Sequence, residues 1–269
     1  MTELLLREGE ILQKVNENIR LIERADGLTF GTDAYLLAAY VRPRARGMLV
    51  DLGSGTGIIP LLCLSRGKAS RCVAVEIQPD FSELIGRNAV ANGFGQVITP
   101  LCADVRDIKA ATVGGEADTV TANPPYMTVS GGARNQSDAK NTARRETAGG
   151  IADFCSAAGR LLKDGGRFYC VFRPDRMVDL ITSLRAARLE PKRMTLVQAT
   201  ASASPSLLLV EAVKHAAPAL LLTPPLFLHM SDPNSPEKPL IPLTHTPDTA
   251  YIYENCAFPA RFTGTNRKP

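Results

Sequence analysis

Short apolar runs alternate with helical segments from Met48 onward, and this alternation restricts the possible folds more than any other feature of the sequence. The pattern predicts buried strands at 48–53, 71–76, 97–104, 117–122 and 167–172. It predicts helices at 58–65, 79–92 and 151–162, and one more from the end of the fifth strand to about Arg188. Repeated strand–helix units form a parallel, doubly wound sheet with helices on both faces.

Two further apolar runs, 192–199 and 207–214, are separated only by a turn rich in Ser, Ala and Pro at 202–206. Because no helix lies between them, we expect them to pair as an antiparallel hairpin. The sequence therefore predicts an α/β fold, with a Rossmann-like, doubly wound, seven-stranded, mostly parallel sheet and a C-terminal antiparallel hairpin. Ligands bind such sheets at the carboxyl ends of the strands.

The two ends of the chain differ in pattern from the main domain, for which we expect residues 48–230. Residues 1–47 form a short N-terminal preface, in which we expect two strands and a helix, at 11–15, 19–22 and 33–40. Residues 231–269 form a Pro-rich tail with little periodicity, which we expect to be loosely ordered. Its one apolar cluster, Tyr251-Ile252-Tyr253, is the part that could dock it.

Composition sets limits on the partners and the location. The net charge of +4 is mildly basic, which permits an anionic partner such as RNA without requiring one. No two of the six cysteines lie within eight residues of each other, so the spacing matches no zinc site, and we expect buried, reduced thiols. The N-terminus lacks the apolar core of a signal peptide, and prolines interrupt the longest apolar stretch, 216–230. We expect a cytoplasmic protein that uses neither a metal nor a membrane.

A glycine-rich turn, Asp51-Leu52-Gly53-Ser54-Gly55-Thr56-Gly57, follows the first strand of the main domain and opens a helix. Glycines at such a turn allow backbone N–H groups to approach a ligand closely. The GxGxG spacing differs from the GxGxxG of dinucleotide sites and from a phosphate-binding loop with a GK[ST] ending. By itself the turn could equally be a tight connection.

Two acidic residues at strand ends favour a ligand site. Glu76 ends the second strand, where a carboxylate can accept hydrogen bonds from both ribose hydroxyls. Asp104 ends the third predicted strand, where a carboxylate can accept a hydrogen bond from an adenine amino group. Each could singly be a solvated acid. Together, at the edge that carries the glycine turn, they indicate a nucleoside ligand whose reactive group reaches toward the fourth strand.

The motif Asn123-Pro124-Pro125-Tyr126 follows that fourth strand. It suits methylation of a planar, conjugated amine, whose delocalised lone pair makes it a poor nucleophile. The Asn side-chain oxygen and a neighbouring carbonyl can both accept hydrogen bonds from the NH2 group, so that the lone pair points at an electrophile. The two prolines stiffen the turn, and the tyrosine ring can stack on a base, which is worth about 1–3 kcal/mol. The alternative is an ordinary strand-ending turn.

These motifs together resemble a class I S-adenosylmethionine-dependent methyltransferase of the amino-methylating kind. The segment 27–38, GLTFGTDAYLLA, resembles the preface of the bacterial tRNA (adenine-N6)-methyltransferases that act on valine tRNA next to the anticodon. The stretches 165–185, 191–198 and 207–214 resemble that family too, so the likeness covers about residues 10–228. Gly31 departs from the family pattern, and the tail after Met230 matches no feature of it.

The resemblance implies methyl transfer from S-adenosyl-L-methionine to the exocyclic N6 amine of an adenosine in tRNA, in the anticodon loop, without a covalent enzyme intermediate. The methionine end of the cofactor would lie at the glycine turn, the ribose at Glu76 and the adenine at Asp104. The implied cofactor residues are Thr32, Asp33, Asp51, Gly53, Ser54, Gly55, Gly57, Glu76, Asp104 and Asn123. The implied catalytic residues are Asn123, Pro124, Pro125 and Tyr126, with the first two holding the amine and the last stacking on the flipped base.

The segment 127–150 is long for a strand–helix connection and contains candidate RNA contacts. The phosphate-binding candidates are Arg134, Lys140, Arg144 and Arg145, against the alternative of a simply solvated loop. Weaker candidates at strand edges are Arg173, Lys192 and Arg193. The three histidines His215, His229 and His245 form no cluster in the sequence, and no role is predicted for them.

Other readings remain open on the sequence alone. A protein-glutamine N5-methyltransferase shares the NPPY chemistry, but such enzymes generally carry a helical domain before the first strand, and only 47 residues precede Met48. An rRNA or DNA amino-methyltransferase is a second alternative, although DNA enzymes usually carry a recognition domain for which the chain has no room. A non-catalytic RNA-binding module is a third, and Asn123 argues against it.

Overall fold

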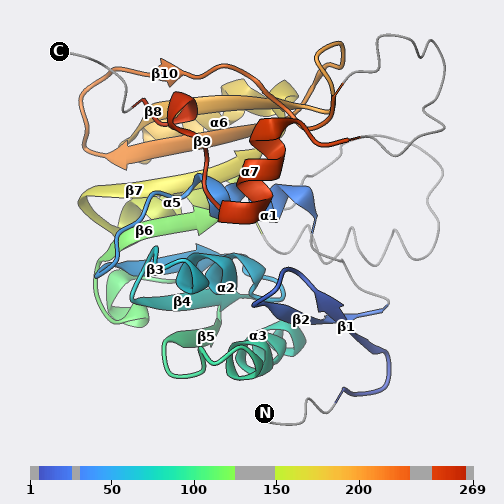
Figure 1. Cartoon of the computed structure of the whole chain (residues 1–269). Coiled ribbons are helices and arrows are strands. Elements are labelled where there is room, and N and C mark those ends of the chain that lie inside the picture. Colours follow the sequence, from blue (N-terminus) through green and yellow to red (C-terminus); the bar gives the residue numbers. More distant parts are fainter. Residues whose placement is uncertain (1–5, 26–30, 125–148, 231–243, 265–269) are drawn as a thin grey trace, which may run out of the picture.

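The computed structural model describes residues 6–25, 31–124, 149–230 and 244–264. Its main sheet has the strand order β10-β8-β9-β7-β6-β3-β4-β5, and β11 pairs with β8 beside this path (Figure 1). The seven long strands are β3 (Met48–Leu52), β4 (Arg71–Glu76), β5 (Ile98–Cys102), β6 (Ala117–Ala122), β7 (Leu162–Phe172), β8 (Leu189–Gln198) and β9 (Pro205–Lys214). The two short ones are β10 (Leu221–Leu222) and β11 (Leu226–Phe227).

Strand direction confirms the predicted sheet. Strands β3 to β7 run parallel to one another, whereas β9 lies antiparallel between β7 and β8. The prediction missed β10 and β11, which pair in parallel with β8. Two-residue strands separated by Pro224 and Pro225 are too short to show any alternation in the sequence.

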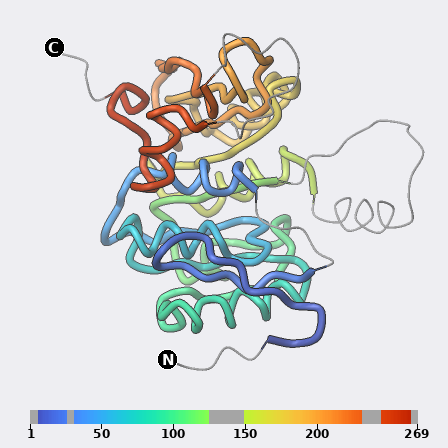
Figure 2. The backbone as a smooth tube through the Cα atoms, turned by 45° about the vertical axis from the view of Figure 1, so that its right-hand side comes forward, coloured from blue at the N-terminus to red at the C-terminus, as the bar shows by residue number. Residues whose placement is uncertain are grey.

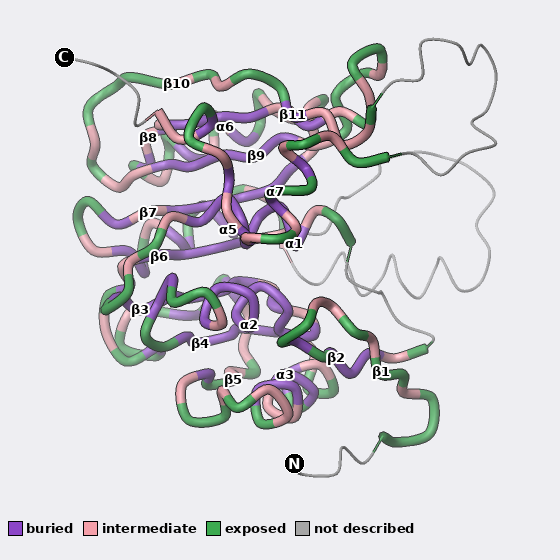
Figure 3. The backbone as a smooth tube through the Cα atoms, viewed as in Figure 1, coloured by how far each residue is buried: buried purple, intermediate pink, exposed green. Residues whose placement is uncertain are grey.

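Helices cover both faces of the sheet (Figures 1 and 2). One face carries α1 (Thr32–Tyr40), α2 (Ile58–Ser65) and α3 (Pro79–Ala91), and the other carries α5 (Ile151–Leu161) and α6 (Met177–Ala186). Successive strand residues point to opposite faces, so Leu49 joins the core under α1 and α2 while Val50 joins the core under α5. The inner strands β3 and β4 are almost entirely buried, as Figure 3 shows, and burial on both faces explains why their sequences are largely apolar.

The N-terminal preface has the predicted strands and helix. Strand β1 (Glu10–Lys14) pairs antiparallel with β2 (Arg20–Arg24), and this hairpin precedes α1. Asn88 of α3 fixes the hairpin to the main sheet domain, because its Oδ1 accepts from the Ile22 N–H at 2.7 Å and its Nδ2 donates to the Ile22 carbonyl at 3.0 Å.

The expectation of a loosely ordered C-terminal tail is wrong for residues 244–264. These form helix α7 (Pro247–Asn255) and a single 3-10 turn (Ala260–Phe262), and the side chains of Ile252 and Phe262 are completely buried. The predicted docking cluster 251–253 lies in α7, where Ile252 is completely buried and Tyr253 contacts Tyr35, and Phe262 adds a buried side chain outside that cluster. The start of α7 did carry a local signal, since Thr246 caps the helix by accepting from the Thr249 N–H at 3.3 Å, directly before a proline.

Candidate active site

The carboxyl ends of three neighbouring strands bring predicted site residues together. Leu52, the last residue of β3, pairs with Val75 of β4 on one side and with Ala122 of β6 on the other. The chain therefore leaves all three strands at the same edge of the sheet. The residue that follows each of these partners is a predicted site residue, namely Gly53, Glu76 and Asn123.

The turn after β3 has a backbone conformation that favours glycine at three positions. The φ angles of Gly53, Gly55 and Gly57 are +67°, +57° and +83°. A Cβ atom on Gly53 would lie 3.3 Å from Phe154, and one on Gly57 would lie 3.3 Å from Ile85. A Cβ atom on Gly55 would have no neighbour within 4 Å. The turn is thus packed against the domain at its ends and open at Gly55, where a ligand can approach the backbone.

Glu76 ties the glycine turn to the end of β4. Its Oε2 accepts a hydrogen bond from the Gly55 N–H, and its Oε1 accepts one from the Gln78 N–H, both at 3.0 Å. The residue is 5% exposed. An ionised carboxylate has about four acceptor positions. Two are used by these backbone bonds, and Gln78 Nε2 also donates to Oε1 at 3.5 Å, so the two ribose hydroxyls predicted at Glu76 would share the carboxylate with the Gln78 side chain.

Asp51 lies beneath the glycine turn and is completely buried. Ser54 and Thr121 donate hydroxyl hydrogen bonds to its two carboxylate oxygens, each at 2.6 Å. Burial raises the pKa of Asp51 to about 7, although both hydroxyl bonds act in the opposite direction. Since Thr121 stands two residues before Asn123 on β6, Asp51 links the glycine turn to the strand that carries the NPPY motif. This buried position lets Asp51 support the turn from below.

Asn123 contacts the N-terminal preface. Its Nδ2 donates a hydrogen bond to Oδ2 of Asp33, in the first turn of α1, at 3.0 Å. The other oxygen of Asp33 accepts from the Ala34 N–H at 2.9 Å. The structure thus brings together two predicted site residues that lie 90 positions apart in the sequence. Pro124 follows Asn123 and is buried.

Asp104 is held by Arg106. Strand β5 ends at Cys102, so Asp104 lies in the turn beyond the strand and not at its last residue, which corrects the predicted strand end. The Arg106 guanidinium contacts both carboxylate oxygens and lowers the pKa of Asp104 against the opposing effect of burial. An adenine amino group at Asp104 would have to share the carboxylate with Arg106. The adenine role stays a prediction.

Several predicted residues lie outside the described part of the chain. These are Pro125, Tyr126, Arg134, Lys140, Arg144 and Arg145. Their assigned roles in stacking and in phosphate contact therefore stay predictions.

Two residues that shape the site were missed in the sequence. Thr121 holds Asp51, and Asn88 donates from Nδ2 to the Thr56 carbonyl in the glycine turn at 3.0 Å. Asn88 does have a sequence signal, because it is a polar residue on the apolar side of α3, next to Ala89 and in line with Leu84 and Ile85. Thr121 has none, since a threonine is ordinary in a strand.

Of the weaker RNA candidates, one is buried and two lie nearer the surface with partners of their own. Arg193 is 1% exposed and pairs with Glu211 at 2.8 Å, which rules out direct contact with RNA. Arg173 pairs with Asp175, and the Lys192 ammonium donates to a backbone carbonyl at 3.0 Å. Arg193 is therefore excluded as an RNA contact, whereas the roles of Arg173 and Lys192 stay predictions.

Two of the histidines form a cluster, which the sequence analysis did not foresee. The rings of His229 and His245 stack with centroids 5.3 Å apart, and the ring of Tyr253 stacks on His245 at 5.1 Å. The cluster assembles because residues 229 and 245 also pair as an isolated β-bridge. Their separation in the sequence hides this pairing.

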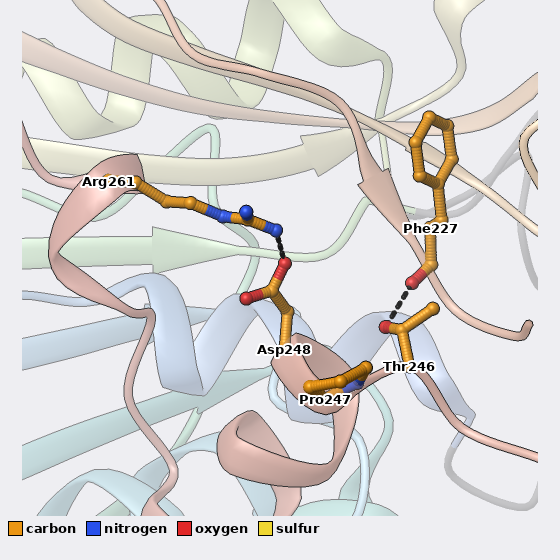
Figure 4. Close-up of a pocket in the computed structure, with 5 residues that line it drawn as sticks. All are labelled: Phe227, Thr246, Pro247, Asp248 and Arg261. Carbon is orange, nitrogen blue, oxygen red and sulfur yellow. Dashed lines mark hydrogen bonds and ion pairs between the residues drawn. The ribbon is translucent and has the colours of Figure 1, made fainter.

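A pocket of about 280 Å³ lies at the start of α7 (Figure 4). Asp248 and Arg261 form an ion pair there, and the Thr246 hydroxyl donates to the Phe227 carbonyl at 2.6 Å. Among the described residues, none of those predicted for the cofactor or the amine lines this pocket. It belongs to the packing of the C-terminal segment and not to the site at the sheet edge.

Within the described ranges, no helix has the length and apolarity needed to cross a membrane. The same residues contain no group of three or more His, Cys, Asp or Glu side chains arranged to hold a metal ion.

The chain is similar in sequence to known methyltransferases. Residues 38–130 match the family model of the TRM5/TYW2 methyltransferase domain. A tRNA1(Val) (adenine(37)-N6)-methyltransferase of Porphyromonas gingivalis is 30% identical over 184 residues, which span 66% of this chain and 71% of that protein. A protein of the same name from Bacteroides fragilis is 28% identical, over 65% of this chain and 73% of its own length.

Solved structures share the fold. A protein of Agrobacterium tumefaciens described as a predicted O-methyltransferase superposes with a TM-score of 0.65 at 23% identity, over 85% of this chain and 98% of that one. The TYW2 protein of Pyrococcus horikoshii in complex with MeSAdo superposes with a TM-score of 0.55 at 16% identity, over 78% and 73% of the two chains. At these identities the likeness concerns the fold alone.

The sheet order, the glycine turn beside Glu76, and the Asn-Pro turn at the end of β6 thus occur in a chain whose sequence aligns with most of the length of the P. gingivalis protein. The chain belongs to the family of the bacterial tRNA1(Val) (adenine(37)-N6)-methyltransferases.

Proposed function

We propose that this chain transfers a methyl group from S-adenosyl-L-methionine to the exocyclic N6 amine of an adenosine in tRNA, in the anticodon loop. The observation that carries the proposal is the position of Asn123 beside the glycine turn, since Leu52 and Ala122 are partners in the sheet register. A residue that grips an amine must lie next to the methyl donor. The names of the relatives support tRNA and adenine as the substrate class.

The residues at the sheet edge suit the cofactor. The open face of the turn at Gly55 admits a ligand to the backbone, and the buried carboxylate of Glu76 retains acceptor capacity for a ribose diol. When bound, S-adenosylmethionine supplies an activated methyl group on a sulfonium. We assign the methionine end to Gly53, Ser54, Gly55 and Gly57, the ribose to Glu76 and the adenine to Asp104, with Asp51 supporting the turn from below.

The main contribution of the protein to the reaction is to align the target amine with the methyl donor. Oδ1 of Asn123 and the Pro124 carbonyl would each accept one N6–H hydrogen bond, each worth about 1 kcal/mol. The larger effect is that the nitrogen lone pair is held toward the methyl donor, as orientation contributes more than any single bond. Tyr126 would stack on the adenine. The N–C bond would form as the S–CH3 bond of the donor breaks, which leaves S-adenosylhomocysteine. The methylated amine would then release one N6 proton to solvent.

The anticodon loop suits this arrangement. Extruding a base into a pocket costs a few kcal/mol, and least where the base is unpaired. The basic residues between 127 and 150 would hold the phosphates on either side, which fixes position without reading sequence. A tRNA substrate also supports the cytoplasmic location that we propose for the protein.

The test uses the purified full chain, methyl-labelled S-adenosylmethionine and two acceptors, unmodified tRNA and a translation release factor. We expect label in the tRNA, and nuclease digestion should release it as N6-methyladenosine. Label in a glutamine of the release factor with the tRNA inert would replace the proposal with the protein-glutamine alternative. Label in tRNA as a different methylated nucleoside would refute the assignment to the N6 amine.

A further inference from the structure

We propose that Asp33 is a positioning residue that sets the orientation of the Asn123 amide, and that the C-terminal segment 244–264 keeps Asp33 in place. The proposal rests on the proposed function, because it assigns a role in holding the target amine. It replaces the expectation that Asp33 is a cofactor residue. The first step is the contact between Asn123 Nδ2 and Asp33 Oδ2, at 3.0 Å.

This contact distinguishes the two ends of the amide. An asparagine side chain has a donor end and an acceptor end, and an ionised carboxylate can only accept. Asp33 therefore favours the rotamer in which Nδ2 faces helix α1. Oδ1 then faces away from Asp33, and it is the end that an N6–H group requires. An amide turned by 180° would present its own N–H groups to the amine, donor against donor.

The position of Asp33 depends on a glycine. The Asp33 carboxylate folds back over Gly31, where a Cβ atom would lie only 2.7 Å from Oδ1 of Asp33. Gly31 has an extended backbone, with φ of −103°, so clearance is the reason for a glycine there and conformation is not. The departure from the family pattern at Gly31 thus leaves the space that this carboxylate occupies. A Cβ atom at position 31 would require the Asp33 carboxylate, the flexible end of that side chain, to shift from its present place.

The C-terminal segment braces the same turn of α1. Helix α7 lies against α1 in both views of the backbone (Figures 1 and 2). The ring of Tyr253 lies 4.9 Å from that of Tyr35, and the Tyr35 hydroxyl donates to the Tyr253 carbonyl at 2.7 Å. The Tyr253 hydroxyl lies 3.5 Å from that of Thr32 and donates to it. Tyr253 thus contacts α1 on either side of Asp33, so the segment that the sequence analysis expected to be a loose tail supports the residue that orients Asn123.

The histidine cluster extends this brace. His245 stacks on the outer side of Tyr253, and His229, which follows β11, stacks on His245. Strand β11 runs parallel to β8 and ends at the edge of the sheet where β6 ends. The stacked rings of His229, His245 and Tyr253 therefore connect the end of β11, which pairs with β8, to the start of α1.

The main test is a double-mutant cycle on Asp33 and Asn123. Methylation of tRNA is measured at saturating substrate for wild type, Asp33→Ala, Asn123→Ala and the double variant, and S-adenosylhomocysteine binding is measured for each by calorimetry. Loss of a hydrogen bond to a charged group predicts that Asp33→Ala lowers kcat by roughly 10- to 100-fold. Its affinity for S-adenosylhomocysteine should stay within about twofold of wild type, and the double variant should be no slower than Asn123→Ala.

Two results would overturn the role of Asp33. One is a loss of S-adenosylhomocysteine affinity large enough to account for the fall in activity, which would restore the direct cofactor role. The other is additive loss in the double variant, which would mean that Asp33 acts independently of Asn123. Failure of the proposed function is distinguishable, because it appears in the wild-type arm as tRNA without label.

The brace is tested with Tyr253→Ala against a matched control, Tyr251→Ala, on the same helix but with a side chain that is 45% exposed. We expect a several-fold lower kcat for Tyr253→Ala with unchanged S-adenosylhomocysteine affinity, and no change for Tyr251→Ala. Tyr253→Phe retains the ring and should be partly active, even if the alanine variant is poorly folded. Full activity in both Tyr253 variants would show that the C-terminal segment does not act on Asp33.

Discussion

Replacing Asp51 by asparagine tests how much the buried carboxyl beneath the glycine turn changes the stability of the protein with pH. The pKa of this buried carboxyl rises from 3.8 to about 7 on folding, chiefly because burial disfavours the charged form. Between these two values the folded chain binds more protons than the unfolded chain, so the contribution of Asp51 to stability falls as the pH rises from about 4 to about 7. At 1.36 kcal/mol per pKa unit, the loss amounts to about 4 kcal/mol.

Urea unfolding of wild type and of Asp51→Asn at five pH values from 4 to 8 isolates this effect, since the other titrating groups are common to both proteins. Asparagine carries no titrating charge, and the hydroxyls of Ser54 and Thr121 can rotate to suit an amide. The stability of the variant relative to wild type should therefore increase by about 4 kcal/mol between pH 4 and pH 8.

A constant difference across this pH range would refute the reasoning, because it would mean that Asp51 ionises in the folded protein as readily as in water. The control is Asp80→Asn, whose side chain is 80% exposed. Its ion pair is a surface one, so its stability difference from wild type should stay below about 1 kcal/mol at every pH.

Three further changes have expected outcomes. Arg193→Ala leaves Glu211 buried without its closest partner on β8, so urea unfolding should show a loss of about 3–5 kcal/mol; a loss below 1 kcal/mol would mean that Arg42 and Arg167 neutralise Glu211 by themselves. Gly55→Ala places a side chain on a residue with a left-handed φ and should lower the free energy of unfolding by about 1 kcal/mol. The free energy of S-adenosylhomocysteine binding should fall by more than this amount, and unchanged affinity would remove Gly55 from the cofactor site. Ile252→Ala creates a cavity under α7 and should cost about 2–5 kcal/mol, with faster hydrogen exchange in residues 244–264; unaltered exchange there would contradict the docking of this segment.

The central sheet could be predicted from the sequence because its inner strands are buried on both faces. The runs 71–76 and 117–122 appear in the structure with the predicted bounds. The first is apolar in its middle and is followed closely by helix α3, and the second is almost entirely buried although it contains Asp and Thr. The antiparallel hairpin of β8 and β9 was equally readable, because a turn of a few residues cannot contain a crossover helix.

The C-terminal segment was predicted only in part. The apolar cluster 251–253 indicated where it docks, but the order of the rest of the segment depends on tertiary contacts. Ile252 and Phe262 are buried against α1 and the hairpin, but nothing in the local sequence identifies their partners. Arg193 was misread for the same reason. Its guanidinium lies 3.6 Å from the centre of the Tyr40 ring and pairs with Glu211, so a charge that suggested RNA contact is part of the core.

The sequence predicted individual residues of the site but not the contacts between them. Glu76, the glycine turn and Asn123 could be placed at one sheet edge from strand order alone. The contact between Asp33 and Asn123 could not, because it depends on how the preface folds back over β6. Local motifs identify the groups that bind a ligand, whereas the groups that orient them become visible only in the structure.

The most direct test of the account concerns Asn123. Nucleosides from tRNA treated with wild type or with Asn123→Ala are quantified by mass spectrometry, and S-adenosylhomocysteine binding is measured for both proteins. We expect N6-methyladenosine from wild type, a fall of about 100-fold or more in its rate of formation by the variant, and equal affinity for S-adenosylhomocysteine. Formation of N6-methyladenosine by Asn123→Ala at the wild-type rate would contradict the claim that the end of β6 holds the target amine.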